Sequence, residues 1–299
     1  MLNPFPSHLK YPEEYGFAIN EVKNFYLKTE DGESLGAWHI PSNEQSTFEF
    51  GSHYLPTHDL TKAKIVFLFF HGNAANRGLP HRLTNYFLLR KVPGAHVVAF
   101  DYRGFGDSSG FPTETGVIKD SLTFVEWIAQ SVSYKKIFFV GHSLGTGPTV
   151  KVARLLEERN TPVGGIINLG SYTTIPDAAI TYPLARVLLP LINFEFVKHF
   201  VKENCSVQLD SLSLMKDLTT PLLLVHGERD FDIPVTHSNA LFNAISNDSM
   251  EEVFFQDGTL LKSKSKRAWY LRLKYAGHNN LQTYPQTETA LFDFINQVL

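Results

Sequence analysis

A serine with a glycine two residues away on each side is the first feature of this sequence that could do chemistry. The segment Gly141-His-Ser-Leu-Gly145 follows a continuous apolar run and opens a helix-like stretch. A sharp turn from a buried strand into a helix lifts a serine hydroxyl above the sheet, and glycine on either side lets the neighbouring backbone approach closely. The helix N-terminus behind the serine favours negative charge nearby. The pattern therefore predicts Ser143 as a nucleophile, in preference to a passive serine in a glycine-rich turn.

A serine hydroxyl needs a base, and the base needs a carboxylate that orients it. Asp230 follows one apolar run and His278 follows the last one, which gives the chain order nucleophile, acid, base. Asp232 is an alternative acid, but Asp230 is closer to the strand end, where a side chain is better fixed. His226 is an alternative base, but it precedes the acid and is better interpreted as a buried, hydrogen-bonded histidine. We therefore predict Asp230 and His278 as the partners of Ser143.

Attack on a carbonyl creates an oxyanion, which two N–H donors must stabilise. The main-chain N–H of Leu144, directly after the nucleophile, is the first expected donor. The second is expected in the segment His71-Gly-Asn-Ala-Ala75, where Gly72 permits close approach and Asn73 is the predicted donor through its main chain. An ordinary glycine-containing loop is the alternative interpretation of this segment.

Strands that alternate with helices must position these groups. The pattern of apolar residues predicts eight strands, at residues 23–28, 34–40, 65–70, 95–100, 136–140, 165–169, 221–226 and 268–275. The first two form a hairpin about Asp31-Gly32. The later ones are separated by helix-like segments, which is typical of parallel βαβ units. We predict an α/β fold with a mostly parallel eight-stranded sheet and helices on both faces, as a single domain over residues 1–299.

Residues 171–218 interrupt this alternation with an apolar, proline-broken segment. It is expected to be an inserted cap, or lid, whose apolar side chains accept an acyl chain. The predicted substrate pocket consists of His142, Leu188, Leu191 and Phe194. The segment Asp101-Tyr-Arg-Gly-Phe-Gly-Asp107 is interpreted as structural, because its charged side chains can tie loops together by charge-assisted hydrogen bonds.

Composition excludes several other classes of protein. The 299 residues carry a formal net charge of −3 and no long basic run, so no nucleic-acid partner is expected. Cys205 is the single cysteine, so the fold cannot depend on an internal disulfide. We see no metal-ligand cluster, dinucleotide motif, signal peptide or apolar run of about 18 residues, and we expect no cofactor, no metal and no membrane span. The short basic stretch at residues 262–267 is interpreted as a solvated turn or as a contact with anionic lipid.

Four segments carry a family resemblance. They are His71-Gly-Asn-Ala, Arg77-Gly, residues 101–114 and Gly141-His-Ser-Leu-Gly-Thr-Gly147, which closely resemble the eukaryotic α/β-hydrolase-domain lipases that cleave monoacylglycerols and lysophosphatidylserine. The resemblance implies the α/β-hydrolase fold, a Ser–Asp–His triad at the three residues chosen above, and hydrolysis of lipid esters at a membrane surface. Unlike the animal members, this sequence is expected to contain no transmembrane anchor.

Three functions remain open at this point. The first is a serine esterase for lipid esters or small esters, cytoplasmic or peripherally associated with an intracellular membrane. The second is another serine hydrolase, such as an acyl-protein thioesterase or a peptidase, because the same triad serves each reaction. The third is a non-catalytic binding protein, against which the full set of nucleophile, acid and base argues.

Overall fold

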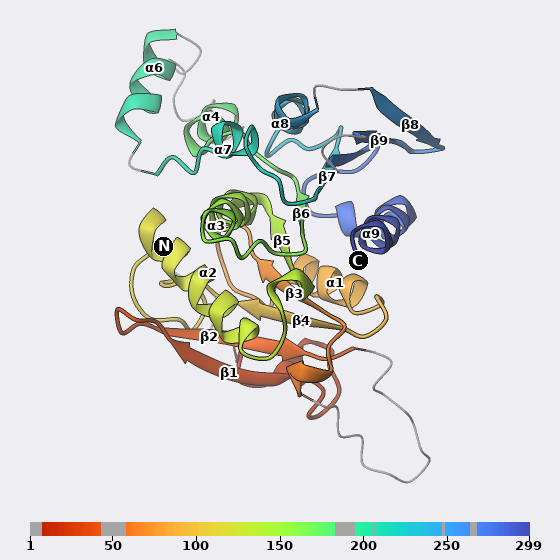
Figure 1. Ribbon diagram of the computed structural model, residues 1–299. Helices are drawn as coiled ribbons and strands as arrows, with labels where there is room; N and C mark the ends of the chain where they lie inside the picture. Colours follow the sequence, from red (N-terminus) through yellow and green to blue (C-terminus); the bar gives the residue numbers. More distant parts are fainter. Residues whose placement is uncertain (1–7, 43–57, 183–194, 206, 247–248, 264–267) are drawn as a thin grey trace. The chain divides into compact units, whose positions relative to one another are not determined.

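The computed structural model describes residues 8–42, 58–182, 195–205, 207–246, 249–263 and 268–299. The chain divides into two compact units. One contains residues 1–140 and 161–164, and the other contains residues 141–160 and 165–299. Figure 1 labels the helices and strands of the chain. A single domain over residues 1–299 stays a prediction.

The first unit is built on a sheet with the strand order β1-β2-β4-β3-β5. β1 (Lys23–Lys28) and β2 (Ser34–Ile40) form the expected hairpin, and β2 pairs antiparallel with β4 (Ala95–Phe100). β4 pairs parallel with β3 (Ile65–Phe70), and every residue of both strands is buried. β5 (Ile137–His142) continues into the second unit. The uninterrupted apolar runs thus became strands covered on both faces.

The second unit has the strand order β6-β7-β10-β9-β8. β6 (Gly165–Leu169) and β10 (Ala268–Leu273) both pair parallel with β7 (Leu222–Gly227). β9 (Gly258–Ser263) pairs antiparallel with β10 and with β8 (Met250–Phe255). The β8–β9 hairpin was not predicted, so the described residues contain ten strands where eight were expected.

Helices connect and flank these strands. The first unit contains α1 (Pro80–Leu89), α2 (Glu114–Ala129) and the 3-10 helices η1 (Pro12–Tyr15), η3 (Leu60–Lys62) and η4 (Tyr134–Lys136). The second contains η5 (Ser143–Gly145), α3 (Thr146–Glu158), α4 (Ile175–Thr181), α6 (Glu195–Asn204), α7 (Ser211–Met215), α8 (Thr236–Ile245), η7 (Leu281–Thr283) and α9 (Pro285–Val298). No helix in the described ranges is long and apolar enough to cross a membrane.

The segment 171–218 contributes α4, α6 and α7, and α7 packs against α3 and α8. Three residues of the predicted substrate pocket, Leu188, Leu191 and Phe194, lie outside the described residues. The cap therefore stays a prediction.

Candidate active site

Ser143 lies at a strained turn between β5 and α3. Its φ is +53°, in the left-handed region that side chains rarely adopt. A Cβ at Gly141 would lie 2.6 Å from Asn168 Oδ1 and 2.9 Å from the carbonyl oxygen of Gly145. Only glycine fits at position 141, so the turn can form as the sequence pattern predicted.

The peptide after Ser143 is held from its carbonyl side. The Ser143 carbonyl accepts hydrogen bonds from Thr146, both from its hydroxyl at 2.8 Å and from its main-chain N–H. The Leu144 carbonyl accepts a hydrogen bond from the Tyr172 hydroxyl at 3.0 Å. In a planar trans peptide the C=O and the following N–H point in opposite directions. The Leu144 N–H therefore points away from Thr146.

Asp230 and His278 meet in the second unit, on loops that follow β7 and β10. His278 Nδ1 lies 2.7 Å from Asp230 Oδ2, and Asp230 is 6% exposed. The other carboxylate oxygen, Oδ1, accepts hydrogen bonds from the main-chain N–H groups of Asp232 and Ile233 at 3.0 and 2.8 Å. Asp232, the alternative acid, thus contributes its main chain to the position of Asp230.

His226 lies at the end of β7 and supports the same carboxylate. Its Nε2 is 2.9 Å from the Ile233 carbonyl oxygen and 3.2 Å from Asp230 Oδ2, and its Nδ1 is 2.6 Å from Ser238 Oγ. A carbonyl can only accept, so Nε2 carries the hydrogen and Nδ1 accepts from the Ser238 hydroxyl. His226 is buried as the sequence suggested, but sequence reasoning missed its contact with Asp230.

These contacts keep Asp230 ionised. Burial raises the pKa of Asp230, but the hydrogen bonds from His226 and His278 outweigh burial and hold the pKa well below its usual range. A carboxylate that receives four N–H donors in a buried place is stable only as the anion. Asp230 can therefore fix the orientation of the His278 ring through Nδ1–H.

Two further residues surround the His278 ring. Gly170, at φ +64° after β6, leaves room for it, because a Cβ there would lie 3.1 Å from His278 Cε1. His142 lies with its Nε2 3.0 Å from the His278 carbonyl oxygen, and the two rings are 5.0 Å apart. Its predicted part in a substrate pocket stays a prediction. Gly170 was missed, since a glycine after a strand gives no signal of its own.

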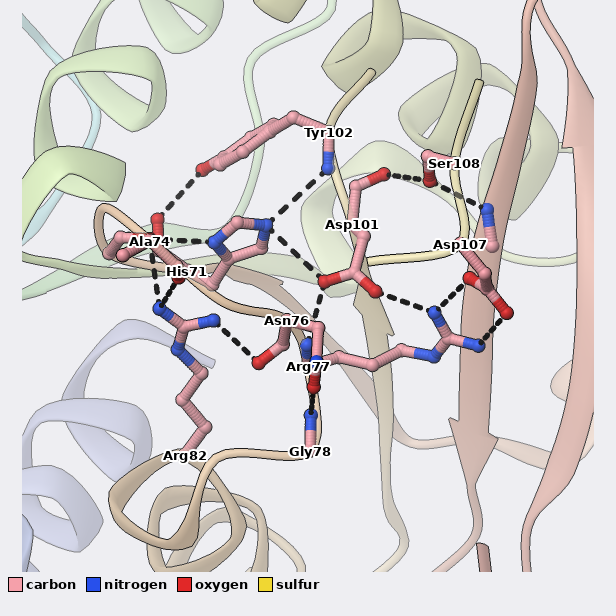
Figure 2. Close-up of polar contacts among 12 residues, drawn as sticks. His71, Ala74, Asn76, Arg77, Gly78, Arg82, Asp101, Tyr102, Asp107 and Ser108 are labelled. Atoms are coloured by element: carbon pink, nitrogen blue, oxygen red, sulfur yellow. Dashed lines mark hydrogen bonds and ion pairs between the residues drawn. The ribbon is translucent and has the colours of Figure 1, made fainter. Parts of the chain in front are cut away.

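The predicted second oxyanion segment lies in the first unit, between β3 and α1. Asn73 is exposed at the start of this loop, and Ala74 and Ala75 adopt φ of +64° and +53°. Figure 2 shows the buried polar network next to the loop. Arg77 Nη1 lies 2.6 Å from a carboxylate oxygen of Asp101 and 2.6 Å from one of Asp107. The charged segment 101–107 therefore ties loops together, as its structural interpretation predicted.

No three His, Cys, Asp or Glu side chains among the described residues are grouped so that they could hold a metal ion. The chemistry available to the described residues is that of a strained serine, a carboxylate-bound imidazole and main-chain N–H donors.

Comparison with known proteins defines the class. Residues 65–191 match the model of the α/β hydrolase fold. Among solved structures, the chain is similar to the Pyrococcus furiosus esterase Pf2001, with a TM-score of 0.67 and 18% identity over 100% of this chain and 96% of that one. It is also similar to an α/β-hydrolase from Vibrio vulnificus, with a TM-score of 0.67 and 16% identity over 98% and 88% of the two chains. The chain is an α/β-hydrolase, and the predicted fold is confirmed.

Three relatives identify the family. The lysophosphatidylserine lipase ABHD12 of Danio rerio is 33% identical over 80% of this chain, and that of Mus musculus is also 33% identical over 80%. The human protein ABHD12B is 33% identical over 82% of this chain and 67% of its own length. The chain belongs to the ABHD12 family of α/β-hydrolases, as the sequence resemblance predicted. It spans 62% and 60% of the Danio and Mus relatives.

Proposed function

We propose that this protein is a serine hydrolase that cleaves carboxylic esters of lipids, such as monoacylglycerols or lysophospholipids, through an acyl-enzyme. The observation that carries the proposal is the 2.7 Å contact between His278 Nδ1 and the buried Asp230 carboxylate. The strained backbone of Ser143 and the names of the lysophosphatidylserine lipase relatives support it. Action at the surface of an intracellular membrane is part of the same proposal.

The proposed reaction uses each residue in one role. His278 Nε2 takes the hydroxyl proton of Ser143 while Oγ attacks the ester carbonyl, and Asp230 stabilises the imidazolium that forms. The N–H groups of Leu144 and Asn73 donate to the oxyanion. His278 then protonates the leaving alcohol, which departs and leaves an acyl group on Ser143. Water, deprotonated by the same imidazole, releases the acid and restores the serine.

The first test is covalent labelling. Wild-type protein is expected to react with a fluorophosphonate probe and to hydrolyse p-nitrophenyl esters. Ser143→Ala is expected to lose labelling, and hydrolysis should fall on the order of a millionfold, because the triad acts as one unit. Ser213→Ala, on the exposed side of α7, is the matched control and should behave as wild type. Labelling that survives in Ser143→Ala would assign the nucleophile elsewhere.

A substrate panel then separates the alternatives. It contains monoacylglycerols, lysophosphatidylserine, p-nitrophenyl acetate and an S-acylated peptide. A lipid esterase should show higher kcat/KM for the long-chain oxygen esters than for the acetate. A preference for the S-acylated peptide would favour an acyl-protein thioesterase, and a wild-type protein that neither labels nor turns over any substrate would favour a binding protein.

A further inference from the structure

A buried guanidinium lies against the loop that leads from β3 to α1. Arg82, in the first turn of α1, is 1% exposed. Its two terminal nitrogens donate hydrogen bonds to four main-chain carbonyls, those of Gly72 at 2.9 Å, Asn73 at 3.3 Å, Ala74 at 2.8 Å and Asn76 at 2.6 Å. Figure 2 shows Arg82 directed at this loop from below. One side chain thus determines the orientation of several consecutive peptides.

The charge of Arg82 has an unusual environment. Buried cations in proteins are normally paired with a carboxylate, because an isolated charge is costly to remove from water. Arg77, in the same network, follows this rule with Asp101 and Asp107. Within the described residues no carboxylate forms an ion pair with Arg82, which meets carbonyl dipoles instead.

The carbonyl of Gly72 is held by two side-chain donors. It accepts a hydrogen bond from Arg82 Nη2 and a second one, at 2.7 Å, from His71 Nδ1. Since a carbonyl only accepts, Nδ1 of His71 carries the hydrogen, and its Nε2 faces the main-chain N–H of Tyr102 at 3.4 Å. Two buried donors therefore fix the Gly72 carbonyl.

The other side of this peptide is the N–H of Asn73. Because the peptide is planar and trans, this N–H points away from Arg82 and His71. Neighbouring main-chain N–H groups find acceptors within the first unit. The N–H of Ala74 donates to Asn73 Oδ1 at 2.9 Å, and the N–H of Arg77 donates to Asp101 Oδ1 at 2.6 Å. The Asn73 N–H meets no acceptor among the described residues. It is oriented by its own carbonyl side and left available to a ligand.

We infer that Arg82 is a positioning residue for the oxyanion hole, which aims the Asn73 N–H at the charge that develops on the substrate and strengthens it as a donor. The strengthening follows because a cation on the carbonyl oxygen polarises the whole peptide and makes its N–H a better donor. The inference rests on the proposed function and adds to it a residue that does not touch the substrate.

The test compares two buried arginines, one in the first turn of α1 and one just after its last turn. Arg82→Gln removes the charge and most of the donors, and Arg82→Lys keeps the charge with a single nitrogen. Arg90→Gln is the matched control, because Arg90 is 4% exposed beyond the last turn of α1 and pairs with Glu21. Fluorophosphonate titration gives the concentration of active sites, so that kcat is expressed per competent molecule and loss of folded protein is removed from the comparison.

The expected effect is a loss of transition-state stabilisation. Per titrated site, Arg82→Gln should lose about tenfold to hundredfold in kcat for p-nitrophenyl acetate, less than the ~10² to 10³ lost when an oxyanion donor is deleted outright. Affinity for a trifluoromethyl ketone, whose adduct mimics the oxyanion, should fall in parallel. Affinity for the unreactive methyl ketone should stay within about twofold, and Arg82→Lys should lie between wild type and Arg82→Gln. Arg90→Gln should lower the thermal midpoint and leave kcat per site unchanged.

A second pair of variants acts on the same carbonyl from the other side, should Arg82→Gln fail to fold. His71→Asn keeps a donor near the position of Nδ1, whereas His71→Leu removes it. His71→Leu should lose kcat and ketone affinity together, and His71→Asn should restore most of both.

The two possible failures are distinguishable. If Ser143 is labelled and the wild type turns over, but Arg82→Gln retains wild-type kcat per site and ketone affinity, Arg82 is purely structural and this inference is overturned. If the wild type itself fails to label at Ser143, the proposed function has failed instead.

Discussion

Replacing Asp230 with asparagine tests the proposed acid, because its oxygens have different partners. Oδ1 accepts from two main-chain N–H groups, and Oδ2 lies against the N–H groups of His226 and His278. The asparagine side chain has one oxygen, and the main-chain N–H groups of Asp232 and Ile233 can only donate. The amide oxygen will therefore take the Oδ1 place, and the NH₂ group will face both histidines.

That arrangement forces the wrong tautomer. His278 Nδ1 must then accept from the new NH₂ group, so the ring hydrogen moves to Nε2, the atom that has to accept the serine proton. In the serine protease triad the same change costs about 10⁴-fold in kcat. That factor corresponds to about 5 kcal/mol of transition-state stabilisation. We expect a loss of this size for Asp230→Asn.

The assay is kcat/KM for p-nitrophenyl esters, with active sites counted by fluorophosphonate and folding checked by the thermal midpoint. Asp232→Asn is the matched control, since it keeps the main-chain N–H that holds Asp230. Its activity should stay within about threefold of wild type. Comparable losses in both variants, or a larger loss in Asp232→Asn, would refute the assignment of the acid.

Two further predictions concern histidines. His226→Leu should lower kcat about tenfold or more through loss of the Nε2–H contact with Asp230, and His226→Gln, which keeps a donor at that place, should recover much of it in the same ester assay; equal losses would make His226 mere packing. Burial and then the neighbouring His58 lower the pKa of His96 to about 4, and burial holds the pKa of His39 well below its usual range. Below about pH 6.5 these histidines are therefore protonated in the unfolded chain while both rings stay neutral in the folded protein, so the unfolded state binds more protons. Their contribution to stability is therefore complete above that pH and lost as the pH falls towards 4; urea unfolding across this range should show the loss, and His96→Asn should reduce its slope, whereas an unchanged slope would contradict the argument.

Local patterns predicted much of the fold. The apolar runs at residues 65–70 and 95–100 became β3 and β4 with the same bounds. The β8–β9 hairpin was missed, although Asp257-Gly258, where the turn meets the start of β9, is a hairpin turn signal, because β8 is largely exposed and lacks a long apolar run. A sequence pattern that searches for buried strands overlooks a strand at the edge of a sheet.

The supporting residues of the candidate site could not be predicted in this way. His226 meets Asp230 because the turn after β7 brings its imidazole to a carboxylate only four residues later, and Gly170 meets His278 only after β6 and β10 have both paired with β7. Arg82 looks like any helical arginine in the sequence. These contacts depend on how the chain turns and pairs, which residue type and spacing alone do not encode.

Each of the two proposed oxyanion donors is oriented through the carbonyl of its own peptide, and the two peptides belong to separate units. The Leu144 N–H belongs to a peptide whose carbonyl, that of Ser143, is fixed by the buried Thr146. The Asn73 N–H belongs to a peptide whose carbonyl is fixed by Arg82 and His71. Because the amide plane is rigid, binding the acceptor end orients the donor end without occupying it. Donors fixed in this way need no reorganisation when charge develops on the substrate, and such preorganisation is the main source of electrostatic catalysis. The two peptides differ in one respect, because the donor on the Gly72 carbonyl carries the formal charge of Arg82 whereas Thr146 is neutral.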